Sequence, residues 1–80
     1  MNNIMLDTLK SNLITSAYLT NNNANMEDVN RNHVSYGATT AYAHVLLCFG
    51  SNVKISVHEV NGFLKITKIV IDTKEITFEI

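Results

Sequence analysis

The chain carries no formally charged side chain between Arg31 and Lys54. Within this stretch, residues 33–49 have helical spacing, with apolar or small side chains on nearly every side of the helical wheel. A helix without a polar face cannot lie half in water and has to be covered on most sides. We therefore expect the fold to be organised around a helix over residues 33–49 and around whatever covers it.

A first, amphipathic helix is predicted over residues 4–19. Apolar side chains recur there at intervals of three and four residues, at Leu6, Leu9, Leu13 and Ala17. Residues 20–25 are rich in asparagine, which competes for backbone hydrogen bonds, so they predict a loop. Asn25 is expected to cap a short turn over residues 26–30 that either leads into the main helix or is offset from it by a kink. Gly50 is expected to end that helix.

The main helix carries two stripes of apolar and small residues. The first consists of Val34, Gly37, Ala38, Ala41, Val45, Cys48 and Phe49. Because small side chains let another backbone approach closely, this stripe is expected to press on a sheet or on the first helix. The second stripe lies nearly opposite and consists of Tyr36, Ala43 and Leu47. It is core if the first helix lies against it, and otherwise an exposed patch for a partner or a second copy.

Residues 51–80 predict an antiparallel meander of three strands. The first strand, Val53–Val60, alternates apolar and polar side chains. Asn61 and Gly62 then favour a type I′ hairpin turn, which needs positive φ at both central positions. The second strand loses its alternation at Thr67 and Lys68, as a β-bulge would allow.

The third strand is expected to follow a turn at Thr73 and Lys74. That turn would set Ile71 opposite Ile76, Ile69 opposite Phe78 and Lys68 opposite Glu79. The sequence thus predicts one α+β domain over residues 1–80, with two helices packed on one face of a three-stranded antiparallel meander in the order ααβββ. The other face of the sheet would be polar and exposed.

Charge, size and cysteine content exclude several classes of protein. Six basic and seven acidic residues give a net charge of −1, which argues against a duplex-binding domain with clustered Lys and Arg. The polar residues of the uncharged stretch argue against a membrane span. A single cysteine, Cys48, excludes an intrachain disulfide and favours the reducing cytoplasm. Since 80 residues build only a small core, a homodimer that covers the main helix is also expected.

His44 and Cys48 are the only pair with spacing that suggests chemistry. Four residues apart on a helix, they could form a Cys–His nucleophile pair or half of a metal site. Catalysis also needs an orienting group and an oxyanion hole, and a metal needs further ligands; the sequence supplies none of these nearby. We therefore expect a structural role for both residues, no enzyme activity, no metal and no cofactor.

The outer face of the sheet is the other candidate site. Together with the second helical stripe it gives six candidate partner-binding residues: Tyr36, Leu47, Lys54, His58, Lys65 and Lys68. The three lysines could instead contact a nucleic-acid backbone, but single-strand readers usually add exposed aromatic residues for base stacking. Only Phe63 is a candidate for that role, so nucleic-acid binding is the alternative hypothesis.

In general build, the chain resembles small inhibitor proteins of phages and mobile elements, such as anti-CRISPR proteins. The resemblance covers the whole chain in size, in the helix-plus-meander layout and in the asparagine-rich composition, with Asn21, Asn22, Asn23 and Asn25. It implies a non-enzymatic protein in the host cytoplasm that sterically occupies a surface of a host defence protein, such as a CRISPR-Cas component. It transfers no functional residue.

Overall fold

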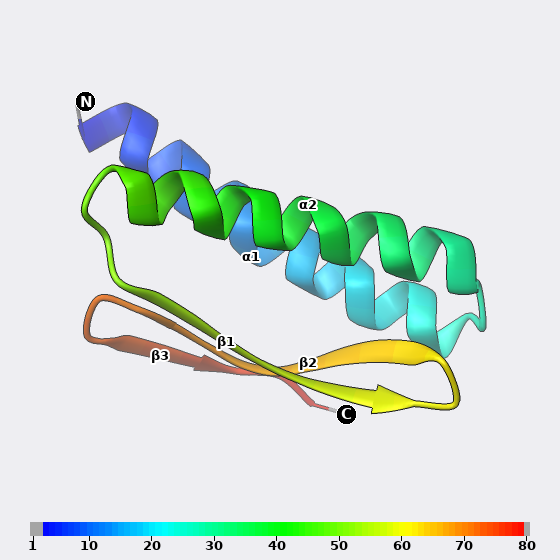
Figure 1. The fold of residues 1–80 in the computed structure, drawn as a ribbon. Helices are drawn as coiled ribbons and strands as arrows, with labels where there is room; N and C mark the ends of the chain where they lie inside the picture. Colours follow the sequence, from blue (N-terminus) through cyan, green and yellow to red (C-terminus); the bar gives the residue numbers. More distant parts are fainter. Residues whose placement is uncertain (1–2, 80) are drawn as a thin grey trace.

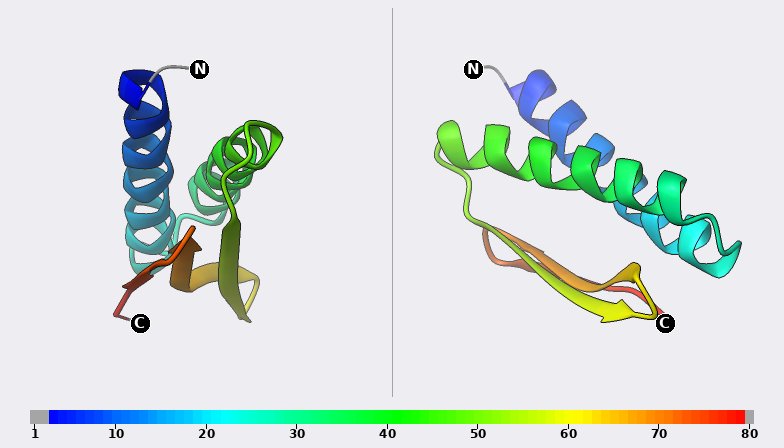
Figure 2. Two further views of the ribbon diagram at one scale, coloured as in Figure 1. Left: turned by 90° about the vertical axis from the view of Figure 1, so that its left-hand side faces the viewer. Right: turned by 45° about the vertical axis from the view of Figure 1, so that its right-hand side comes forward.

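The computed structural model describes residues 3–79 and has two helices on one face of a three-stranded antiparallel sheet (Figure 1). In chain order its elements are α1 (Asn3–Asn25), α2 (Val29–Cys48), β1 (Val53–Val60), β2 (Phe63–Ile71) and β3 (Lys74–Thr77). Two further views show both helices on the same side of the sheet (Figure 2). The strand order is β1-β2-β3. The predicted α+β class and ααβββ order are confirmed.

Helix α1 continues through the asparagine run instead of ending at Leu19. Two asparagines of the run have partners on other elements. The side-chain amide of Asn21 bonds to the backbone of Ile66 in β2, and Asn23 Nδ2 donates to the carbonyl of Arg31 at 3.2 Å. The predicted loop over residues 20–25 is wrong because these tertiary hydrogen bonds outweigh the preference of asparagine for irregular backbone.

The helices are joined by residues 26–28 only. Asp28, not Asn25, is the N-cap: its backbone is extended and its carboxylate accepts the N–H of Arg31 at 3.0 Å. The turn expected over residues 26–30 covers only residues 26 and 27, and α2 begins at Val29, four residues before His33. At the other end Gly50 has a φ of +93°, the left-handed conformation expected after a helix.

The β1–β2 hairpin has the predicted turn and bulge. Asn61 and Gly62 have φ values of +53° and +85°, as a type I′ turn requires. The register shifts between Ser56 and Val57, which leaves Thr67 as the extra residue of β2. Thr67 Oγ1 donates to the carbonyl of Ser56 at 3.2 Å and so ties the bulge to β1.

The second turn lies one residue earlier than predicted, at Asp72 and Thr73, so the expected register is wrong. Ile71 lies opposite Lys74, Ile69 opposite Ile76 and Lys68 opposite Thr77. Asp72 adopts a φ of +56°, which aspartate tolerates, and its carboxylate accepts the N–H of Asn52 at 3.0 Å. Lys68 consequently pairs with Glu75, at 3.1 Å, and not with Glu79.

The core lies between the sheet and the two helices. Its buried members come from every layer: Leu13, Ala17, Ala43, Leu46, Val53, Ile66, Ile69, Ile71 and Phe78. Phe78 follows β3, but its N–H still donates to the carbonyl of Thr67 at 2.9 Å. Its ring meets Tyr18 edge-on with centroids 4.9 Å apart, which links the end of the sheet to α1.

The buried side of α2 is polar along its first half. Its buried residues are Asn32, Ser35, Thr39, Ala43 and Leu46. Thr39 Oγ1 donates to Ser16 Oγ of α1 at 2.8 Å, and Asn23 Nδ2 donates to Ser35 Oγ at 3.2 Å. Hydroxyl and amide groups can therefore fill this helix interface because each one finds a partner.

This polar interface overturns two expectations about α2. The stripe that was expected to press on the sheet or on α1 lies largely in solvent, with Val34 75% exposed. The helix is also not covered on most sides, since its buried residues occupy a single narrow face. Sequence periodicity counted apolar side chains, whereas the packing used polar side chains whose hydrogen bonds are satisfied.

Two asparagine side chains complete the sheet where β3 stops. β3 pairs with Lys68–Ile71 only, so on that side Leu64 and Ile66 have no neighbouring strand. The amide of Asn32 accepts the N–H of Leu64 and donates to its carbonyl, both at 2.8 Å. Asn21 does the same for Ile66, at 2.7 and 2.9 Å. Each amide thus replaces one residue of a missing strand.

Asn32→Ala should strongly destabilise the fold. The fully buried Asn32 side chain also donates to the carbonyl of Thr20 at 2.8 Å, so the substitution removes three hydrogen bonds and leaves both backbone groups of Leu64 without this partner. We expect a loss of about 3 kcal/mol in the free energy of unfolding, measured by urea denaturation. The control, Asn22→Ala, removes an exposed asparagine amide from α1 and should change it by less than about 0.5 kcal/mol. Equal effects would contradict the strand-replacing role.

Candidate partner-binding surfaces

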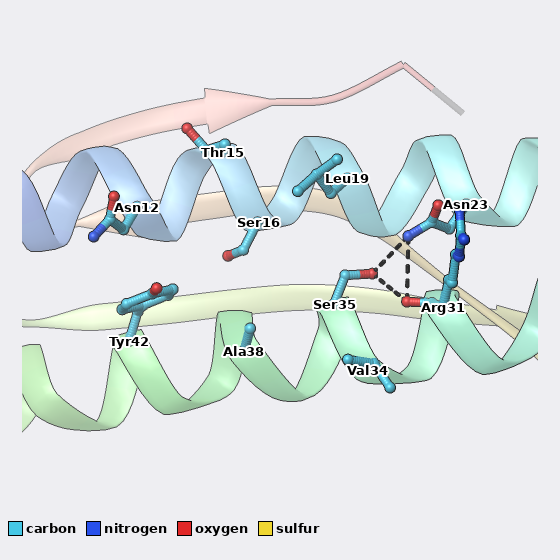
Figure 3. Close-up of a pocket in the computed structure, with 10 residues that line it drawn as sticks. All are labelled: Asn12, Thr15, Ser16, Leu19, Asn23, Arg31, Val34, Ser35, Ala38 and Tyr42. Atoms are coloured by element: carbon cyan, nitrogen blue, oxygen red, sulfur yellow. Dashed lines mark hydrogen bonds between the residues drawn. The ribbon is translucent and has the colours of Figure 1, made fainter.

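A groove of about 370 Å³ runs between α1 and α2, with the sheet behind both helices in the close-up (Figure 3). Ser16 and Ser35 approach each other from the two helices within it, and the apolar lining comes from Leu19, Val34, Ala38 and Tyr42. Leu19 and Val34 are 50% and 75% exposed. The groove is chemically suited to receiving apolar side chains rather than to catalysis, because no ionisable acid–base pair lines it.

The second helical stripe is divided between core and surface. Tyr36 is half-buried and packs against the core, and Ala43 is buried within it. Leu47 is 48% exposed. The sequence left open whether this stripe is core or an exposed patch. Tyr36 and Ala43 belong to the core and Leu47 lies at the surface, so the stripe is not one continuous exposed patch.

The four sheet residues predicted as a site lie on one face. Their side chains alternate with inward-facing residues, and the register places His58 opposite Lys65 and Ser56 opposite Lys68. Val60 and Phe63, which pair with each other next to the turn, share this outer face. Lys54 and His58 are exposed, whereas Lys65 and Lys68 are half-buried.

The outer face has a local excess of positive charge. Lys68 is neutralised by Glu75 at 3.1 Å. Lys54 and Lys65 have no ion pair within residues 3–79. A partner with acidic side chains would therefore be attracted to the β1 side of this face.

Sequence reasoning overlooked the free edge of β1. In an antiparallel ladder, opposite residues exchange both backbone hydrogen bonds or neither. Ile66 and Leu64 direct their backbone groups to Asn21 and Asn32, so their opposite residues in β1, Val57 and Glu59, direct theirs away from β2. In the described sheet no strand lies beyond β1. The predicted strand order of the meander already makes β1 an edge strand. It does not show which backbone groups of β1 are free of hydrogen-bond partners.

His44 and Cys48 lie in contact, as their spacing implied. His44 Nε2 is 3.7 Å from Cys48 Sγ, and both side chains are exposed. The part of the chain that the structure describes contains no cluster of three or more His, Cys, Asp or Glu residues that could hold a metal ion. The contact supplies neither an orienting acid nor a pocket, so no chemistry is assigned to it.

The chain matches no protein-family model, no curated protein and no solved structure. Neither helix in residues 3–79 is long and apolar enough to cross a membrane.

Substitutions along the second helical stripe should separate its core part from its surface part. Tyr36→Ala removes a ring packed against the core and should lower the free energy of unfolding by about 2 to 3 kcal/mol. Leu47→Ala, in the half-exposed position, should cost less than about 1 kcal/mol. Thermal and urea unfolding of both variants measures the difference. A larger cost for Leu47→Ala would contradict the division.

Proposed function

We propose that this chain is a non-enzymatic protein-binding module that takes up an extended segment of another protein along β1. The observation that carries this proposal is the eight-residue edge strand whose Val57 and Glu59 backbone groups point outward without a partner in residues 3–79. An extended segment can add to such an edge through main-chain hydrogen bonds. By contrast, the exposed edge of β2 is closed by two asparagine side chains.

The chemistry of the outer face supports an acidic partner. Lys54 and His58 belong to β1 itself, so an added strand would place alternate side chains beside them. Acidic side chains at those positions would meet Lys54, which has no ion pair among the described residues. A segment added at the β1 edge would thus also contact the outer face of the sheet and the Asn61–Gly62 turn.

The proposed effect is steric. A bound module would cover a surface of its target, and no catalytic step is needed. This agrees with the expectation of a cytoplasmic inhibitor, of the kind encoded by phages, that acts on a host defence protein such as a CRISPR-Cas component. A homodimer, expected from the small core, is part of the same proposal.

Val57→Pro should abolish partner capture without unfolding the protein. Proline removes the outward N–H and places its ring in the path of an added strand, while the position makes no ladder bond to lose. The matched control, Val57→Thr, keeps the N–H and the β-branched shape. With each variant as bait in a lysate of the host cell in which the chain acts, quantitative mass spectrometry should find proteins held by wild type and Val57→Thr and reduced about tenfold with Val57→Pro.

The outcomes of this experiment are distinct. Circular dichroism and the unfolding midpoint establish that Val57→Pro is folded. Equal capture by all three baits would refute docking at the β1 edge. Lys54→Glu should weaken the same capture if the partner is acidic, and stronger capture would contradict that charge assignment.

Nucleic-acid binding through Lys54, Lys65 and Lys68 is the alternative. Lys68 is already paired with Glu75, and Phe63 is the sole aromatic residue on the outer face in residues 3–79. We therefore expect no complex with single-stranded DNA or RNA in a mobility-shift assay at low salt. A complex that weakens steeply with added salt and disappears in the Lys54→Ala, Lys65→Ala double variant would favour the alternative.

A further inference from the structure

The solvent-facing side of α2 carries a heptad-spaced strip. Its members recur at intervals of three, four, three, four and three residues: Arg31, Val34, Ala38, Ala41, Val45 and Cys48. This spacing, hereafter the α2 strip, is that of the contact positions of a two-stranded coiled coil. It lies outside the buried face of α2, and Val34 and Val45 are 75% and 36% exposed. Three of its members, Arg31, Val34 and Ala38, line the groove in Figure 3.

The α2 strip is complementary to itself when two copies run antiparallel. In the register that sets Ala38 opposite the second copy's Ala41, Val34 lies opposite the second copy's Val45. Every contact then occurs twice, as two-fold symmetry requires. Alanine at the centre lets the two backbones approach closely, and the valines at both ends supply apolar area.

Charge also favours a second copy in this orientation. From residue 32 to residue 53 the chain carries no formal charge, so the facing strips bring no like charges together. The same register sets Arg31 opposite the second copy's Cys48, the last residue of its α2. That helix has no basic residue in its last turn, and a cation is favourable at a helix C-terminus. The guanidinium is free to reach it, because the Arg31 side chain is 79% exposed despite its pairing with Asp28.

A parallel arrangement is less favourable on the same grounds. It would place Arg31 opposite the second copy's Arg31 and leave both helix C-termini without a cation. Antiparallel packing also brings Phe49, which is 55% exposed, toward the Arg31 end of the second copy's groove, where Leu19 is half exposed. Phe49 and Leu19, which are exposed in a single copy, would thereby be covered by the second copy in the dimer.

We propose that this chain forms an antiparallel homodimer by packing the α2 strip of one copy against the α2 strip of a second. The inference deepens the homodimer of the proposed function by naming its seam, and it is independent of the β1 edge. The seam expected from the sequence, at Tyr36 and Leu47, is replaced by the opposite side of α2. Both sheets remain uncovered in such a dimer.

The mass in solution tests the seam. Light scattering across a concentration series should give twice the 8.9 kDa of one chain for the wild type. Ala41→Glu introduces a charge at the centre of the α2 strip and should give the mass of one chain. The matched control is Thr40→Glu, on a neighbouring exposed position outside the strip, which should remain a dimer. A monomeric wild type, or a dimeric Ala41→Glu with unchanged circular dichroism, would overturn the proposal.

The native cysteine tests the register. In the antiparallel dimer the two Cys48 side chains are 17 residues apart along the seam, about 26 Å, so the oxidised wild type should not form a disulfide-linked dimer. Arg31→Cys places a thiol opposite the second copy's Cys48 and should cross-link under the same mild oxidation. Thr40→Cys serves as the control without cross-linking. Efficient cross-linking of the wild type through Cys48, or none of Arg31→Cys, would refute the antiparallel register.

The two proposals fail separately. Val57→Pro should leave the mass of the dimer unchanged, and Ala41→Glu should leave the β1 edge able to hold its target. A protein that is monomeric but still captures a partner through β1 would refute the homodimer and its seam but not the docking edge. A dimer that captures nothing through β1 would sink only the docking edge.

Discussion

The pairing of two asparagine amides with β2 is the interaction on which the rest of the structure depends. A side-chain amide has the same donor and acceptor as a peptide group, so Asn21 and Asn32 can each satisfy one residue of an unpaired strand edge. Asn21 belongs to α1 and Asn32 to α2, so both helices are fixed to the same short stretch of β2. The hydrogen bonds of each amide are directional. They therefore set the position of the helices along the sheet as well as their distance from it.

That constraint explains the polar helix interface. Asn32 also bonds to the carbonyl of Thr20, which brings α1 and α2 together through groups that lose little when buried in pairs. Thr39 and Ser16 continue the contact about two turns further along α2 and one turn earlier in α1. Because hydroxyl and amide groups occupy much of the buried face of α2, Val34, Ala38, Ala41 and Val45 are left at or near the surface. The exposed α2 strip is thus a consequence of how the interior is built.

The molecule consequently presents two surfaces with different chemistry. The helical side is uncharged along the α2 strip beyond Arg31 and suits contact with itself, and the sheet side is open at β1 and basic nearby. In an antiparallel dimer the helices would lie at the centre and two sheet edges would face outward. A target with two binding segments would then be held by both, and linking the two contacts would raise the overall affinity.

Sequence by itself determined the elements that depend on local rules. The strand β1, the Asn61–Gly62 turn, the bulge at Thr67 and the helix end at Gly50 follow from alternation and from residues that tolerate positive φ. The ααβββ order and a polar outer face with Lys54, His58, Lys65 and Lys68 follow as well. These features depend on residues that are close together in the sequence, so a single sequence is enough to predict them.

Only the tertiary structure decided which side of α2 is buried, where α1 ends and how β3 pairs. Each of these depended on a polar group meeting a partner far away in the chain: Asn32 with Leu64, Asn21 with Ile66, and Asp72 with Asn52. An asparagine in a sequence is equally compatible with a loop, a cap or a buried amide. The choice rests on whether a backbone group elsewhere lacks a partner, which no periodicity of apolar residues can reveal.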